Sequence, residues 1–331
     1  MVAVAAMALL LIACTGHPPH PPSSSPLPLR PVGEIALPGD NSRFDYAGID
    51  APRGLLFIAH LGASEVIEVD LHAGHVVRTI PNLRQVHGIL VVSVLNRVFV
   101  TATGANNVVA LDETTGGEVA RGPTGEYPDG MAYDPVHGTI WTTNETAGTE
   151  TVVDPATIQQ RGAVDLGGEV GNVGYDPESD RMLVAVQGRD ELAVIDAGAM
   201  TVTQHVQLPG CNHPHGLTLD TADRLVFVAC DHNATLLTLD QTDWRVTGSH
   251  RVGDHPDVLA YDTGARRLYV AAESGTLTVL DLHGHDLSVT GSGHLADGAH
   301  VVAVDPDTHR SYYPIPAGTG GHPALLERRP E

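Results

Sequence analysis

Imidazole and carboxylate side chains recur along this chain at a nearly constant spacing of about 42 residues. The recurring positions are Asp45, His87, Asp129, Gly171, His215, Asp257 and His300. Gly171 is the one non-polar member, and Asn172 directly after it supplies a polar side chain. Histidine and carboxylate are ligands for Zn²⁺, Cu²⁺ or Ni²⁺, and a carboxylate beside a histidine raises its pKa and permits acid–base chemistry. If the fold gathers these positions, they form either a ligand or metal site or a solvated polar rim.

The segments around these positions indicate which fold gathers them. Each unit contains a short apolar strand, an Asp-led turn, a longer β-branched strand, a polar loop and a third strand ending in Asp, followed by a weaker fourth strand. Units of 40 to 45 residues with about four strands are typical of β-propeller blades. Because seven units can be aligned, we expect an all-β, seven-bladed β-propeller in one domain.

The two ends of the repeat predict how the ring closes. The seventh unit offers strands at 300–304, 310–315 and 323–328, and then the chain ends. The segment 33–39 (GEIALPG) precedes the first unit and resembles the outer strand that ends in HVQLPG. We therefore expect the N-terminal strand to complete the last blade, which would pair both edges of the ring. The propeller is expected to span residues 32–328.

Propeller ligands bind where the inner strands begin and where the loops between second and third strands gather. Polar residues in those loops are His60, Asn106, Asn144, Glu145, Gln187, Asp231, His232 and Glu273. The predicted ligand-binding set at the channel mouth is Asp45, His87, Asp129, Asn172, His215, Asp257, His300, His60, Asn144 and Glu145. The best candidate ligands for a transition metal are His213, His215, Asp231, His232 and Asp257. No GxSxG nucleophile motif accompanies them.

The N-terminal segment and the three cysteines predict an exported protein. Residues 1–13 form an apolar run too short to span a bilayer, and the sequence Leu11-Ile12-Ala13-Cys14 resembles a bacterial lipobox. We expect a signal peptide over 1–13, lipid on Cys14, and a Pro- and Ser-rich tether over 14–31 that holds the propeller off the membrane. Cys211 and Cys230 should reach the same end of one sheet. They form a disulfide, remain two thiols, or bind metal beside His213, His215 and His232.

The charge of the chain limits its partners. The net charge is −22, and all 18 basic residues are arginines. Such an acidic surface argues against binding nucleic acid or anionic lipid through the propeller, because both are polyanions. The absence of lysine excludes Schiff-base chemistry. A small molecule or an envelope protein is the expected partner of a monomer.

The repeat also resembles a known family. Stretches such as YPDGMAYDPVHGTIWTTNETAGTETVVD and VGNVGYDPESDRMLVAVQGRDELAVID are similar to the YVTN-type repeat of YncE-like propellers. The resemblance covers residues 33 to about 328, and it implies seven blades and, for many members, export without a known activity. The first hypothesis for function is therefore a non-catalytic, membrane-tethered propeller that binds a ligand or partner. The alternative is an enzyme similar to lactonase-type propellers or another metal-dependent enzyme, because Asn212–Gly216 resembles their HPH-like strand starts; His215 and nearby carboxylates would then act with a metal-activated water.

Overall fold

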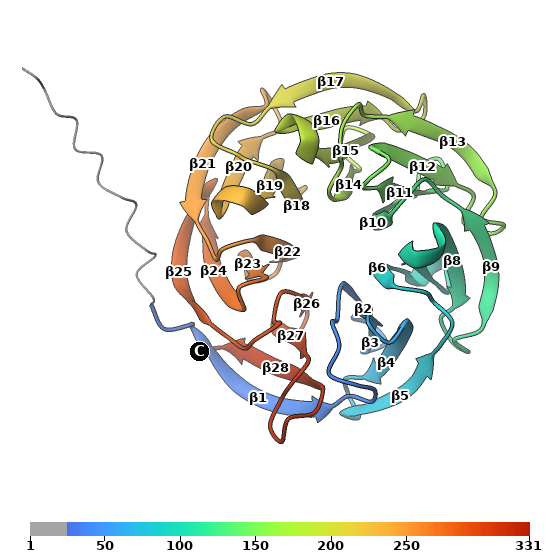
Figure 1. Ribbon diagram of the computed structural model, residues 1–331. Coiled ribbons are helices and arrows are strands. Elements are labelled where there is room, and N and C mark those ends of the chain that lie inside the picture. Colours follow the sequence, from blue (N-terminus) through green and yellow to red (C-terminus); the bar gives the residue numbers. More distant parts are fainter. Residues whose placement is uncertain (1–24) are drawn as a thin grey trace, which may run out of the picture.

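The computed structural model describes residues 25–331 and shows seven four-stranded antiparallel sheets arranged as blades around a central channel (Figure 1). The predicted seven-bladed all-β propeller is confirmed. The predicted signal peptide and lipidated Cys14 lie outside the described residues. Within residues 25–331, no helix has the length and apolar composition needed to cross a bilayer.

The first three blades each run outward from the channel in chain order. Blade one contains β2 (Ala47–Asp50), β3 (Leu55–His60), β4 (Glu65–Asp70) and β5 (His75–Ile80). Blade two contains β6 (Val86–Val92), β7 (Arg97–Ala102), β8 (Asn107–Asp112) and β9 (Glu118–Pro123), with short 3₁₀ turns η1 (Ser93–Leu95) and η2 (Thr103–Ala105). Blade three contains β10 (Pro128–Asp134), β11 (Thr139–Asn144), β12 (Thr149–Val153) and β13 (Gln160–Asp165).

The next three blades repeat this order. Blade four contains β14 (Val173–Asp176), β15 (Arg181–Val186), η3 (Gln187–Arg189), β16 (Glu191–Asp196) and β17 (Thr201–Gln207). Blade five contains β18 (Pro214–Asp220), β19 (Leu225–Cys230), η4 (Asp231–Asn233), β20 (Thr235–Asp240) and β21 (Arg245–Arg251). Blade six contains β22 (Pro256–Asp262), β23 (Arg267–Ala272), β24 (Thr276–His283) and β25 (Asp286–His294).

The seventh blade closes the ring as predicted. Its strands are ordered β26 (Ala303–Asp305), β27 (Arg310–Ile315), β28 (Ala324–Pro330) and β1 (Leu29–Ala36) from the channel outward. β1 pairs antiparallel with β28, so the first and last strands lie side by side (Figure 1). The strand begins earlier than the predicted boundary at residue 32. Ser25 also exchanges backbone hydrogen bonds with Ser292 of β25, so the last part of the predicted tether contacts blade six.

The core lies between neighbouring blades. One cluster joins Phe57 and Val66 of blade one to Val98, Val100 and Val109 of blade two, and similar clusters fill the other junctions. Short β-branched and aliphatic side chains form most of this core, which suits sheets packed face to face. The strand-ending aspartates form the connecting turns: Asp70 Oδ1, for example, accepts a 2.8 Å hydrogen bond from the Ala73 N–H.

Candidate functional site at the channel mouth

Glycines after the recurring positions let the inner strands approach closely enough to gather their polar side chains. A Cβ on Gly88 would lie 2.1 Å from the carbonyl oxygen of Asp129, and one on Gly216 would lie 2.2 Å from that of Asp257. Gly171 has the same explanation, because a Cβ there would lie 2.7 Å from the backbone of His215. The one non-polar member of the recurring set is thus required by packing.

The gathered side chains line a cavity of about 300 Å³ at the channel mouth. The lining contains six carboxyl groups, four imidazoles and one arginine. Its polar members are Arg43, Asp45, Tyr46, His87, Tyr127, Asp129, Glu145, Gln187, His213, His215, Asp231, His255, Asp257 and Glu273. Charge inside the cavity therefore favours a positively charged occupant.

His215 and Asp257 form a buried ion pair on the cavity wall. Their Nε2 and Oδ1 atoms are 3.1 Å apart. Burial alone would lower the pKa of His215, but the hydrogen bond to Asp257 and the charges of Asp257, Asp129 and Glu145 raise it to about 10. Burial would likewise raise the pKa of Asp257, but the hydrogen bond and charge of His215 lower it. This pair is charged at neutral pH.

The other buried carboxyl groups of the cavity hold their protons more tightly than carboxyl groups in water do. Burial raises the pKa of Asp129 to about 7, and the neighbouring Asp45 adds to this effect while His87 opposes it. Burial also raises the pKa of Asp45 and of Glu145. The Asp129 Oδ1 atom is buried and has no hydrogen-bond partner among the described residues. The cavity therefore contains carboxyl groups that lose a proton, and so become negatively charged, when a cation enters.

Arg43 is the one arginine of the lining and bridges three of the acids. Its guanidinium lies 2.6 Å from Glu273 Oε1, 3.5 Å from Asp45 Oδ2 and 3.8 Å from Asp257 Oδ2. The Arg43 side chain is 42% exposed, so solvent screens these contacts. It contacts neither Asp129 nor Glu145, whose nearest cationic influence is the imidazolium of His215.

Tyr46 crosses the channel and separates the cavity from the space below. Its hydroxyl donates to Asp129 Oδ2 at 3.3 Å and lies 3.5 Å from His215 Nε2. The Asn172 amide donates to the same hydroxyl at 2.9 Å. Tyr46 and Asn172 also line a second, more apolar cavity within the channel. Tyr46 therefore forms the floor of the polar site.

His87 and His300 each direct one ring nitrogen toward the carboxyl groups at the channel mouth. Nδ1 of His87 donates to the Gln85 carbonyl at 2.8 Å, and Nδ1 of His300 lies 3.1 Å from the Gly298 carbonyl. Nε2 of His87 accepts from Tyr127 at 3.2 Å, and Nε2 of His300 is buried without a hydrogen-bond partner among the described residues. His300 also lies within metal-ligand reach of Asp45 and Asp257, although Arg43 already contacts both acids.

Four of the ten residues predicted at the mouth do not line this cavity. Asn172 lines the second cavity, and His300 is buried beside Asp45 and Asp257. The other two are His60 and Asn144. His60 is fully buried and stacks on Phe44, with ring centroids 4.3 Å apart, so it is part of the packing of blade one. Asn144 donates through Nδ2 to Thr149 and Thr151 and fixes the turn between β11 and β12. Neither lines the cavity, because both side chains point into their own blade.

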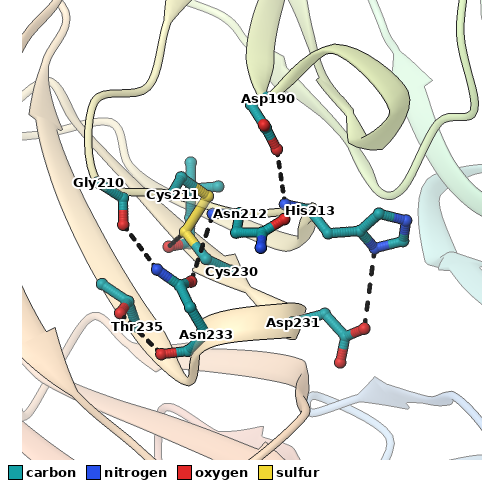
Figure 2. The surroundings of a disulfide bond; sticks show 10 residues. Asp190, Gly210, Cys211, Asn212, His213, Cys230, Asp231, Asn233 and Thr235 are labelled. Atoms are coloured by element: carbon teal, nitrogen blue, oxygen red, sulfur yellow. Dashed lines mark hydrogen bonds and ion pairs between the residues drawn. A yellow bond between two sulfur atoms is a disulfide. The ribbon is translucent and has the colours of Figure 1, made fainter. Parts of the chain in front are cut away.

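The predicted metal set is divided into two groups. His215 and Asp257 form the ion pair described above, whereas His213, Asp231 and His232 bring ligand atoms together at the rim. Figure 2 shows that His213 and Asp231 of this rim group lie beside the Cys211–Cys230 disulfide, whose sulfur atoms are 2.06 Å apart. The cysteines join the loop before β18 to the last residue of β19.

Four polar residues of the lining are absent from the set predicted from the sequence. Arg43, Tyr127 and His255 each stand two positions before a recurring residue, as His213 does, so the same period could have identified them. Tyr127, His213 and His255 adopt left-handed backbone conformations, with φ between 56° and 62°. The fourth, Tyr46, follows Asp45 at a position where three other blades carry glycine.

Comparisons with known proteins extend only to the fold. No family model matches the chain, and no curated protein matches it. Among solved structures, hydrazine synthase from Kuenenia stuttgartiensis superposes with a TM-score of 0.72 at 14% identity, covering 81% of this chain and 91% of that one. Virginiamycin B lyase from Staphylococcus aureus superposes with a TM-score of 0.74 at 13% identity, covering 90% and 98%. At such low identity these likenesses support the architecture alone: this chain is a seven-bladed β-propeller.

Proposed function

We propose that this protein is an exported, membrane-tethered propeller that binds a small organic cation in the cavity at its channel mouth, without catalysis. The observation that carries the proposal is the charge of the lining: in about 300 Å³, six carboxyl groups face two cationic side chains, Arg43 and the protonated His215. A ligand that donates several hydrogen bonds from ammonium or guanidinium groups would satisfy Asp129 Oδ1 and its neighbours. A cavity of this size suits a small molecule.

The tether and the family belong to the same proposal. The lipobox-like segment ending in Cys14 supports lipid anchoring in the cell envelope, and the repeat supports membership of the YVTN-type, YncE-like propellers. Labelling with a radioactive fatty acid tests the anchor. Label should enter the wild-type protein and be absent from Cys14→Ser, and equal labelling of both would refute the anchor.

Three four-carbon probes that differ mainly in charge test the binding site. 1,4-Diaminobutane carries two positive charges, 1,4-butanediol none, and succinate two negative charges. We expect only the diamine to raise the melting temperature at pH 8, because a ligand that binds the folded state alone stabilises it by about 2.7 kcal/mol at one hundred times its Kd. Equal effects of all three probes, or a response to succinate, would refute the proposal.

Two variants locate the response. Asp129→Asn should weaken diamine binding about tenfold, equivalent to about 1.4 kcal/mol, because it removes a charged hydrogen-bond acceptor. Asp286→Asn changes an exposed acid on the outer strand of blade six and should leave binding unchanged. If both variants bound like the wild type, the diamine site would lie outside the cavity.

One observation favours an enzyme as the second candidate. A buried carboxyl group with a pKa of about 7, here Asp129, can both accept and donate a proton near neutrality. Hydrolysis of γ-butyrolactone with and without added Zn²⁺ tests the lactonase-like version. Turnover lost in Asp129→Asn would support catalysis, and no turnover in either protein would rule out this version.

A further inference from the structure

The Asp231 carboxylate at the cavity rim is surrounded by three imidazoles. Oδ2 lies 3.7 Å from His213 Nδ1 and 3.3 Å from His232 Nε2. The two rings are stacked, with centroids 3.9 Å apart and an interplanar angle of 9°. On the other side of the carboxylate, His255 Nδ1 lies 3.0 Å from Oδ1.

These separations suit donors around one ion, but the two stacked rings have nearly parallel planes, so the half-exposed His232 ring must turn before both imidazole lone pairs meet at a common point. Ligands of tetrahedral Zn²⁺ lie about 2.0–2.1 Å from the metal, which places neighbouring ligand atoms roughly 3.3 Å apart. Ligand atoms of His213, Asp231 and His232 all lie within 4.8 Å of one another. His213 Nδ1 is buried and has no hydrogen-bond partner among the described residues, although it faces Asp231. A metal ion would satisfy that nitrogen.

Neighbouring contacts hold the Asp231 carboxylate and the segments that carry His213 and His232 in place. His255 fixes one oxygen of Asp231 and leaves the other directed at the two stacked rings, as partners of metal ligands do. The disulfide connects Cys211, two residues before His213, to Cys230, directly before Asp231. Figure 2 shows Asn233 bonding across the same two segments, through Nδ2 to the Gly210 carbonyl at 2.8 Å.

Backbone contacts between the same segments add to this rigidity. The Asp231 N–H donates to the His213 carbonyl at 2.9 Å, and the His232 N–H donates to the Asn212 carbonyl at 3.2 Å. The ligand-bearing backbones are therefore joined before any metal arrives, which reduces the entropy lost on binding.

We infer that His213 Nδ1, Asp231 Oδ2 and His232 Nε2 form a binding site for one Zn²⁺ ion, with solvent as a fourth ligand. The site lies at the rim, apart from the His215–Asp257 pair. Two of its ligands, His213 and Asp231, also line the cavity, but the zinc site needs neither Asp129 nor Glu145, so the two proposals can fail separately.

Zinc titration of the untagged full-length protein, by calorimetry and by metal analysis after dialysis, tests this inference. We expect one Zn²⁺ per chain, with binding at least tenfold weaker in His232→Ala. His232 is half-exposed, and its side chain has no hydrogen bond within the described residues, so its removal should leave the fold intact. Bound Co²⁺ should give the visible absorption of a tetrahedral site in the wild type and lose it in His232→Ala.

Three control variants make the result specific. His283→Ala removes an exposed histidine on β24, and a His17→Ala/His20→Ala double variant removes the histidines of the N-terminal segment. Both should bind Zn²⁺ like the wild type, and so should Asp129→Asn, which tests the cation site separately. Absence of Zn²⁺ from the wild type, unchanged binding in His232→Ala, or loss of binding in the N-terminal double variant would overturn the inference.

Discussion

The ion pair between His215 and Asp257 should make the stability of this protein fall in mildly alkaline solution. Replacing His215 with Gln removes the imidazolium that lies 3.1 Å from the buried Asp257 carboxylate. The variant should be much less stable than the wild type at pH 6.5, because breaking a buried pair leaves an uncompensated charge. As the pH rises and His215 loses its proton, the two proteins should converge.

The magnitude follows from the pKa of His215. An unfolded histidine titrates near 6.5, whereas the folded protein holds this proton to a pKa of about 10. The stabilisation is fully present below pH 6.5 and is lost as the pH rises from 6.5 through 10. At about 1.4 kcal/mol for each pKa unit, the total is on the order of 5 kcal/mol.

Urea unfolding at pH 6.5, 8 and 9.5 measures this difference. Comparison with the variant cancels most of the contribution of other groups that titrate in this window, such as Asp129; the chain has no lysine, and burial raises the pKa of Tyr46 and Tyr313. The wild-type free energy of unfolding should fall by roughly 1.4 kcal/mol per pH unit relative to His215→Gln. His283→Gln, at an exposed position, should follow the wild type. Parallel pH profiles for the wild type and His215→Gln would refute the reasoning.

Three further predictions concern the scaffold. The Cys211→Ser/Cys230→Ser double variant should have a free energy of unfolding about 3 kcal/mol lower in urea titrations, as expected for loss of a disulfide that closes a loop of 19 residues. An unchanged midpoint of urea unfolding would contradict this. Deletion of residues 25–36 removes β1 and exposes the edge of β28. Size-exclusion chromatography should then show that copies of the truncated protein associate. A monomer with an unchanged melting temperature would argue against closure by β1. Gly216→Ala should destabilise the protein by about 1–3 kcal/mol in thermal melts, because the added Cβ would meet the Asp257 carbonyl. Gly293→Ala should be nearly neutral in the same melts, because its Cβ would make ordinary contacts. Equal effects of the two substitutions would show that inner-strand packing is not as tight as described.

The fold could be predicted from the sequence because every blade repeats the same local pattern. The strand at 310–315 was placed correctly to the residue, and the strand from the N-terminal segment was assigned to the correct blade. The start of β1 was placed too late, because proline-rich sequence before Gly33 suggested a free spacer. Backbone pairing of Ser25 with Ser292 carries no local sequence signal, since it depends on a strand more than 250 residues away.

The site was predictable only in part. The recurring set indicated which end of the channel matters, but residue type did not reveal burial. His60 was predicted at the mouth because it follows a strand, yet it packs on Phe44 inside blade one. Arg43 was missed because the residue type varies at its position, two before each recurring residue, and Tyr46 because the equivalent position carries glycine in three other blades. Side-chain direction in the pore depends on contacts between blades, which one repeat cannot encode.

Proton release on ligand binding tests most directly whether buried carboxyl groups of the cavity form a cation site. Calorimetry of 1,4-diaminobutane binding at pH 7 is repeated in two buffers with different ionisation enthalpies. Asp129, with a pKa of about 7, should give up its proton when the diamine enters, so the observed enthalpy should depend on the buffer in the wild type and lose most of that dependence in Asp129→Asn. Binding enthalpies that are independent of buffer in the wild type, or equally dependent in both proteins, would contradict the account.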